Sequence, residues 1–142
     1  DVADYRTIQN TPEWTLSGTY GASLPVGAGT LDFSTTLSYR SETHQFETPS
    51  PFLDQPGYAL WDANLLYRFG SEERFSVGLH ARNITDQRYI TSGYQFAAGD
   101  AVTGQPTITG SGNIVPSLGL EGVETAFYGN PRQVFVSFSA RF

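Results

Sequence analysis

The sequence predicts an all-β fold of antiparallel strands, of the kind that forms a transmembrane β-barrel. Apolar and polar residues alternate in about five segments of ten or more residues, and this period-two pattern is typical of strands with two unlike faces. The sequence contains no run of 18 apolar residues, so it does not predict a membrane-spanning helix. Only 15% of the residues are charged, against about 25% in ordinary soluble domains. The shortage of charge suggests that part of the surface does not face water.

The alternating segments follow one another along the chain and are separated by turn-forming residues. They cover residues 13–24, 30–40, 58–69, 74–83 and 133–142. The connections alternate between short and long: 25–29 and 70–73 read as tight turns, whereas 41–57 and 85–130 are long and show little periodicity. Consecutive antiparallel hairpins produce this alternation when the short turns lie at one end of a sheet and the long loops at the other.

The two faces of the predicted strands differ in a way that separates a membrane barrel from a soluble β-sandwich. The polar face is rich in Ser, Thr, Asn and Gly, as a wet lumen would be, and no charge falls on the apolar face. Aromatic residues are expected near strand ends on the apolar face, as in the girdles of outer-membrane barrels. These are Trp14, Tyr20, Tyr39, Trp61, Tyr67, Phe69, Phe75 and Phe142. A terminal Phe142 needs no polar tail if it lies at a membrane interface.

Three motifs in order resemble the C-terminal end of a TonB-dependent outer-membrane receptor of the siderophore-receptor type. The first is a Gly-Tyr strand opening, Gly57 and Tyr58. The second is an Arg-Asn-Leu-Thr-Asp-x-x-Tyr segment, with Ile in place of the commoner Leu. It comprises Arg82, Asn83, Ile84, Thr85, Asp86 and Tyr89. The third is a final Tyr-x-x-Pro-Arg strand that closes on Phe, here Tyr128, Pro131, Arg132 and Phe142. The segment 10–14, Asn-Thr-Pro-Glu-Trp, resembles the opening of an earlier strand.

The resemblance implies that residues 1–142 are the last five or so strands of a 22-stranded barrel, without the plug domain and the TonB box. We therefore expect a C-terminal fragment, because an open five-stranded sheet leaves unsatisfied backbone groups in lipid. The function implied is energy-coupled uptake of a large scarce ligand across the bacterial outer membrane, most often a ferric siderophore. The implied partners are the TonB complex (through the missing N-terminal part), the plug domain, outer-membrane lipid and that ligand, with no cofactor.

The resemblance also implies a topology. With Phe142 at the periplasmic rim, the turns 25–29 and 70–73 are periplasmic, and the segments 1–12, 41–57 and 85–130 are extracellular. Loops of this kind help to close over ligand in the family. The candidate ligand-contacting residues, all aromatic, are Tyr89, Tyr94, Phe96, Phe127 and Tyr128.

Other chemistry finds little support in the sequence. The net charge of −6 gives no basic surface for nucleic acid, and there is no Cys for a disulfide or thiolate site. The two histidines, His44 and His80, are not expected to converge on a metal. Ser76 and His80 share a strand face too far apart for a catalytic pair, roughly 13 Å, so we expect no enzyme.

Polar residues of the second motif and of the predicted strand 58–69 are interpreted as structural. Asn83 and Asp86 are expected to cap the strand-to-loop transition through backbone hydrogen bonds. Arg82, Arg68 and Asp62 are expected to pair with lumen charges of other strands or of the plug. Three alternatives remain open from the sequence: a soluble β-sandwich that serves in binding or adhesion, a small barrel to which several chains contribute strands, and an enzyme built on Asp62, Ser76, His80 and Arg82.

Overall fold

The computed structural model describes residues 3–117 and 123–142, and the chain divides into two compact units. The loop unit comprises Asp1–Glu13, Ser41–Gly57 and Tyr89–Gly129. The sheet unit comprises Trp14–Arg40, Tyr58–Arg88 and Asn130–Phe142. The three segments of the loop unit are nearly those that the sequence predicts to be long loops. The turns predicted to be tight belong to the sheet unit.

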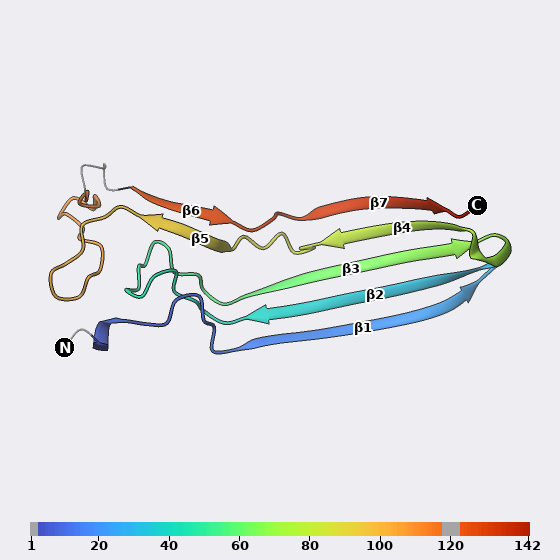
Figure 1. Ribbon diagram of the computed structural model, residues 1–142, viewed down its shortest axis with the longest axis horizontal. Helices are drawn as coiled ribbons and strands as arrows, with labels where there is room; N and C mark the ends of the chain where they lie inside the picture. Colours follow the sequence, from blue (N-terminus) through green and yellow to red (C-terminus); the bar gives the residue numbers. More distant parts are fainter. Residues whose placement is uncertain (1–2, 118–122) are drawn as a thin grey trace. The chain divides into compact units, whose positions relative to one another are not determined.

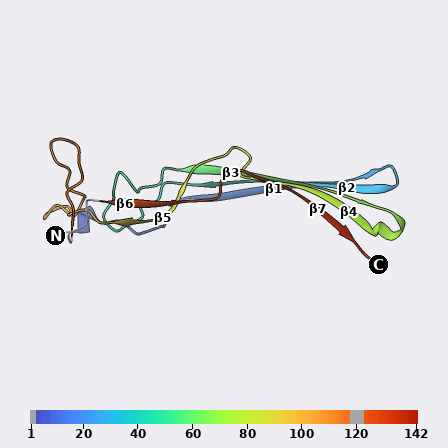
Figure 2. The ribbon, with the colours of Figure 1, turned by 90° about the horizontal axis from the view of Figure 1, so that it is seen from above.

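The sheet unit is one antiparallel sheet of five strands in the order β1-β2-β3-β4-β7 (Figures 1 and 2). The strands are β1 (Thr15–Val26), β2 (Gly29–Arg40), β3 (Tyr58–Phe69), β4 (Phe75–Arg82) and β7 (Gln133–Ala140). These are the five predicted strands, and the all-β, antiparallel prediction is confirmed. Within this sheet β1 and β7 are the edge strands, because each has a neighbour on one side only.

The register places every predicted apolar set on the same face of the sheet. Along one cross-strand row, Phe33 pairs with Ala22 and Leu65, and Leu65 pairs with Leu79, which in turn pairs with Val136.

This apolar face is unusually accessible: the exposed positions of β2 are Phe33, Leu37 and Tyr39, whereas its polar residues are mostly half-buried. Soluble sheets show the reverse pattern, with apolar side chains inward.

Two of the predicted aromatic positions differ in the structure. Tyr20 pairs with Thr35 near the middle of β1 and β2, so it does not lie at a strand end. The last strand stops at Ala140, two residues before Phe142, so the prediction that Phe142 lies within the strand is wrong. The backbone of Arg141 still donates to the Arg74 carbonyl at 2.9 Å, and this bond continues the pairing by one step.

Both tight turns depend on residues with positive φ. Strands β1 and β2 pair as far as Val26 and Gly29, which leaves a two-residue turn in which Gly27 has a φ of 58°. The turn between β3 and β4 begins at Gly70, with a φ of 87°, and continues into the short 3-10 helix η2 (Ser71–Glu73). Positive φ is the conformation that glycine adopts at little cost.

The loop unit contains regular structure that the sequence analysis did not predict. Strands β5 (Ile90–Gln95) and β6 (Glu124–Tyr128) form a two-stranded antiparallel sheet inside the segment 85–130, where the sequence shows little periodicity. Both strands are short, and a β-bulge between Ile90 and Ser92 breaks their alternation. A 3-10 helix, η1 (Ala3–Tyr5), lies in the first segment. No helix of the described residues has the length and apolar character needed to cross a membrane.

Asn83 holds together the end of β4, the turn that follows it and the start of the last strand. Its side-chain amide donates to the carbonyls of Gln87 and Asn130 at 2.9 and 3.0 Å, and its Oδ1 accepts the Gln87 N–H at 2.8 Å. Asp86 Oδ1 accepts the N–H of Arg132 at 2.8 Å. The predicted capping role of Asn83 and Asp86 is therefore confirmed.

We expect Asn83→Ala to lower the free energy of unfolding of the sheet unit by about 2–4 kcal/mol. Asn83 is only 5% exposed, so its loss leaves three backbone groups without partners, and its φ of 47° is unfavourable for alanine. Denaturant unfolding in detergent, followed by tryptophan fluorescence, measures the change.

Asn130→Ala is the matched control, because the exposed Asn130 contributes its backbone carbonyl to Asn83, and this carbonyl survives the substitution. A loss as large in this control as in Asn83→Ala would contradict the role of the Asn83 side chain.

Candidate functional site

One face of the β5–β6 sheet covers the small interior of the loop unit. Leu53 is 1% exposed and is the buried hydrophobic residue among those described. A Cβ placed at Gly93 would come within 3.1 Å of the Leu53 side chain, so glycine lets the sheet approach closely. Ser50, fully buried, directs its hydroxyl at the two carboxylate oxygens of Glu124, at 3.4 and 3.3 Å.

The opposite face of the same sheet presents aromatic rings to solvent. Tyr94 contacts Phe127 edge-on with centroids 5.8 Å apart, and it stacks on Phe96 at 6.3 Å. Tyr94 and Phe127 are 59% and 47% exposed. The structure thus brings together three of the five predicted ligand-contacting residues. We call Tyr94, Phe96 and Phe127 the aromatic cluster.

The other two candidates lie where β5 begins and β6 ends. Tyr128 pairs with Ile90 and is 54% exposed. The ring of Tyr89 lies against Gly129, where any Cβ would overlap it, and the Tyr89 carbonyl accepts the Gly129 N–H at 2.9 Å. Tyr89 is therefore fixed against the backbone at this closure of the loop unit.

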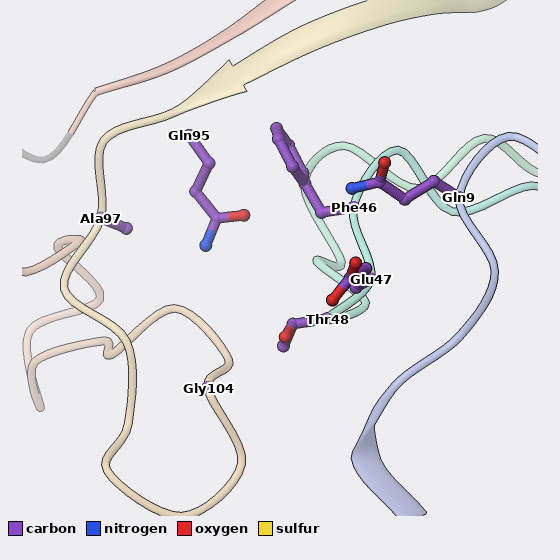
Figure 3. A pocket seen from close by; sticks show the side chains of 7 residues that line it. All are labelled: Gln9, Phe46, Glu47, Thr48, Gln95, Ala97 and Gly104. Atoms are coloured by element: carbon purple, nitrogen blue, oxygen red, sulfur yellow. The ribbon is translucent and has the colours of Figure 1, made fainter. Parts of the chain in front are cut away.

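A pocket of about 310 Å³ opens elsewhere in the loop unit (Figure 3). Its lining residues come from all three segments of the unit: Gln9, Phe46, Glu47, Thr48, Gln95, Ala97 and Gly104. Two carboxamides, a hydroxyl, a carboxylate and one aromatic ring therefore face a single hollow. The volume is near the lower end of the range for small-molecule sites, roughly 300–1,000 Å³.

Glu124 is a partly buried carboxyl group of the loop unit. Burial raises the pKa of its carboxyl above the ordinary value of 4.5; the Ser50 hydrogen bond opposes this rise and the charge of Asp54 adds to it. His44 Nδ1 lies 3.1 Å from Asp54 Oδ2 on the same segment as Ser50. The described residues contain no group of three or more side chains that would hold a metal ion.

The polar face of the five-stranded sheet carries cross-strand hydrogen bonds. His80 lies 2.9 Å from both Asn64 Oδ1 and Ser137 Oγ, and Asn64 in turn donates to Ser34 at 3.3 Å. These contacts link β2, β3, β4 and β7. His80 is therefore engaged as a structural link, and Ser76 takes no part in these bonds.

The charged residues of this face have partners that differ from some expectations. Arg68 pairs with Asp32 of the neighbouring strand β2 at 2.7 Å and with Glu73 of the turn after β3 at 3.3 Å. Asp62 Oδ1 instead accepts the backbone N–H of Asn83 at 2.9 Å. The guanidinium of Arg82 lies over the Phe135 ring, 5.8 Å from its centroid. Within the described chain, Asp62 and Arg82 thus act through a backbone amide and an aromatic ring.

Comparison with protein-family models, curated proteins and solved structures finds no match to this chain.

Sequence reasoning missed the pocket because nothing local signals it. Gln9, Phe46 and Gln95 are far apart in the sequence, and none belongs to a motif. The one available hint was Phe46, an aromatic residue in a Pro-rich polar segment. The packing of Ser50 and Leu53 beneath β5 and β6 was missed for the same reason.

The raised pKa of Glu124 makes the stability of the β5–β6 sheet dependent on pH. Below about pH 4.5 the carboxyl is protonated in both the folded and the unfolded state, and its contribution to stability is fully present. As the pH rises through the higher pKa of the folded state, that contribution is lost. We expect amide hydrogen exchange in β5 and β6, corrected for intrinsic rates, to show weaker protection above this range.

Glu124→Gln keeps the shape and removes the charge, so protection in this variant should no longer decline over that pH range. Glu42→Gln, at an exposed glutamate of the same unit, should behave like the unchanged protein. An unaltered pH response in Glu124→Gln would show that another group is responsible.

Proposed function

We propose that this chain forms the C-terminal strands of a TonB-dependent receptor in the bacterial outer membrane. The observation that carries the proposal is the exposed apolar face of the five-stranded sheet. Fourteen large hydrophobic residues of this face are at least 37% exposed. They are Leu16, Tyr20, Leu24, Val26, Phe33, Leu37, Tyr39, Trp61, Leu65, Val77, Leu79, Val134, Val136 and Phe138.

Lipid is the partner that suits such a face. Exposed apolar patches larger than a few hundred Å² are rare on soluble monomers and mark a surface that something covers. Strands β1, β2 and β3 each have 12 residues. A strand of that length is roughly 40 Å long and, tilted by about 45°, crosses roughly 29 Å. This matches the hydrocarbon thickness of a bilayer, about 30 Å.

The polar face and the edges of the sheet support a barrel rather than a single sheet in lipid. Bonds such as Asn64 to His80 and the pair between Arg68 and Asp32 place polar and charged groups on the side that would face a lumen. The free edges of β1 and β7 require further strands, because unpaired backbone groups are costly in a membrane. A 22-stranded barrel supplies them.

The receptor activity rests on the motif resemblance together with the loop unit. Short turns lie at one end of the strands and the segments of the loop unit join them at the other, which is the arrangement of an outer-membrane barrel. The aromatic cluster then offers extracellular surface to a ligand. Coupling to TonB and to a plug belongs to parts outside this chain, and a ferric siderophore is the cargo that the resemblance implies.

Heat modifiability of outer-membrane fractions tests this proposal directly. An antibody against the segment 85–130 should detect a band far above 15.5 kDa, and this band should shift when the sample is boiled, because closed barrels resist detergent until heated. A soluble band at the size of this chain, without a heat shift, would overturn the proposal and favour a soluble β-sandwich that covers the apolar face with a second sheet.

Neighbouring leucines on opposite faces of β3 give a sharper test. Leu65 is on the apolar face and Leu66 on the polar face. We expect Leu65→Arg to destabilise the receptor in lipid vesicles by about 2–4 kcal/mol, because the charge would enter the hydrocarbon near mid-membrane. Leu66→Arg, which faces the lumen, should cost much less. The two variants are compared by measuring their free energies of unfolding in vesicles and in detergent.

Equal costs for the two substitutions in vesicles would contradict a lipid-facing Leu65. A cost for Leu65→Arg that is the same in the absence of any lipid or detergent would indicate protein packing on this face instead.

A further inference from the structure

The loop unit and the sheet unit differ strongly in charge. The three segments of the loop unit contain nine Asp and Glu residues and a single Arg, which gives a formal charge of −8 with neutral histidine. The sheet unit contains five acidic residues and seven Arg, which gives +2. A surface of one sign repels ligands of the same sign and lowers their association rate. An anionic ligand is therefore disfavoured at the loop unit.

The pocket lining carries little negative charge that could bind a cation. Glu47 is the one charged residue that lines the pocket, and Arg6 Nη1 lies 2.8 Å from its Oε2. The remaining polar groups are the carboxamides of Gln9 and Gln95 and the hydroxyl of Thr48. These groups both donate and accept hydrogen bonds, as a ligand with several hydroxyl groups requires. Phe46 adds an apolar surface within the same hollow (Figure 3).

Backbone hydrogen bonds fix the walls of the pocket. The N–H of Thr7 donates to the Glu47 carbonyl at 2.6 Å, and the N–H of Asn10 donates to the His44 carbonyl at 2.9 Å. These two hydrogen bonds connect the segment that contains Gln9 to the segment that contains Phe46. Gln95 is held on another wall by its pairing with Glu124 at the end of β5. Preformed walls reduce the entropy lost on binding.

The loop that carries Gly104 is also braced. Asp100 Oδ1 accepts the N–H groups of Thr103 and Val102 at 2.8 and 2.9 Å, and these bonds lower the pKa of that carboxyl. Gly104 has a φ of 72° and lies close to Thr48, where a Cβ would come within 3.2 Å of the hydroxyl. Glycine is thus needed for this wall to approach Thr48.

We infer that this pocket binds a neutral sugar unit, so that the cargo of the loop unit is a neutral oligosaccharide and not an anionic ferric siderophore. The inference rests on the proposed transport function and replaces the ferric siderophore that the motif resemblance implies with a different substrate class. Ring hydroxyls meet the carboxamides of Gln9 and Gln95 and the hydroxyl of Thr48, while the carbon-bound hydrogens of the sugar pack against Phe46.

The complete receptor, purified in detergent, tests the inference on an array of neutral, uronic-acid and amino-sugar oligosaccharides, with ferric enterobactin and ferrichrome as iron-loaded probes. We expect binding to at least one neutral oligosaccharide, and binding at least about tenfold weaker to its uronic-acid counterpart. Calorimetry on the strongest binder then measures the effects of substitutions.

Phe46→Ala and Gln9→Ala should each weaken binding at least about tenfold. The controls are Phe52→Ala and Gln105→Ala, at exposed residues of the loop unit that do not line the pocket. These two variants should retain the original affinity. Gln9 is exposed, so its substitution leaves the fold intact and keeps the test valid if Phe46→Ala fails to fold.

Failure of this inference is distinguishable from failure of the transport proposal. The inference is overturned if the receptor binds a ferric siderophore, an acidic sugar or an amino sugar but no neutral oligosaccharide. That outcome leaves the receptor assignment standing. The absence of binding to any neutral member also overturns it, as do equal affinities for the Phe46→Ala and Phe52→Ala variants. Loss of the transport proposal would appear separately, as a soluble protein without heat modifiability.

Discussion

The cross-strand register of the five-stranded sheet sets which side chains share a face. Side chains alternate faces with a period of two, so a slip of one residue would exchange the apolar and polar sets completely. The row that joins Phe33 to Leu65, Leu79 and Val136 shows that no slip occurs across four strands. The same register aligns Ser34, Asn64 and His80 on the other face, where they form hydrogen bonds. One set of backbone pairings thus produces both an exposed apolar face and a hydrogen-bonded polar face.

The two ends of the sheet impose different demands on the chain. At the tight-turn end, two residues suffice between β1 and β2 because Gly27 accepts a positive φ. At the other end, strands continue into long segments, and a polar junction is needed where β4 stops and β7 begins. Asn83 supplies that junction with three hydrogen bonds from a nearly fully buried position. A hydrophobic residue there would leave backbone groups unpaired, so the identity of this residue is set by chemistry and not by packing volume.

The loop unit is stabilised more by polar contacts than by an apolar core. Leu53 is its buried hydrophobic residue among those described, whereas Thr43, Gln45, Ser50 and Gln55 are buried and polar. Gln55 illustrates how such groups are satisfied: its Oε1 accepts the N–H of Ile90 at 2.6 Å, and its Nε2 donates to the Pro56 carbonyl at 2.6 Å. Buried polar groups are tolerated when they are hydrogen-bonded in this way. The loop unit, which depends on such contacts and contains the partly buried Glu124, is suited to present a polar pocket.

The amino-acid sequence alone was enough to predict the strands of the sheet, their faces, the tight turns and the capping role of Asn83 and Asp86. It could do so because period-two alternation and turn residues are local signals that backbone sterics translate directly into structure. Which loop residues come into contact depends on the three-dimensional fold of the loop unit. Strands β5 and β6 are short and interrupted by a bulge, so their alternation is too weak to read. Gln9, Phe46 and Gln95 share a pocket although they lie in three separate segments, and no local pattern links residues whose proximity depends on long-range folding.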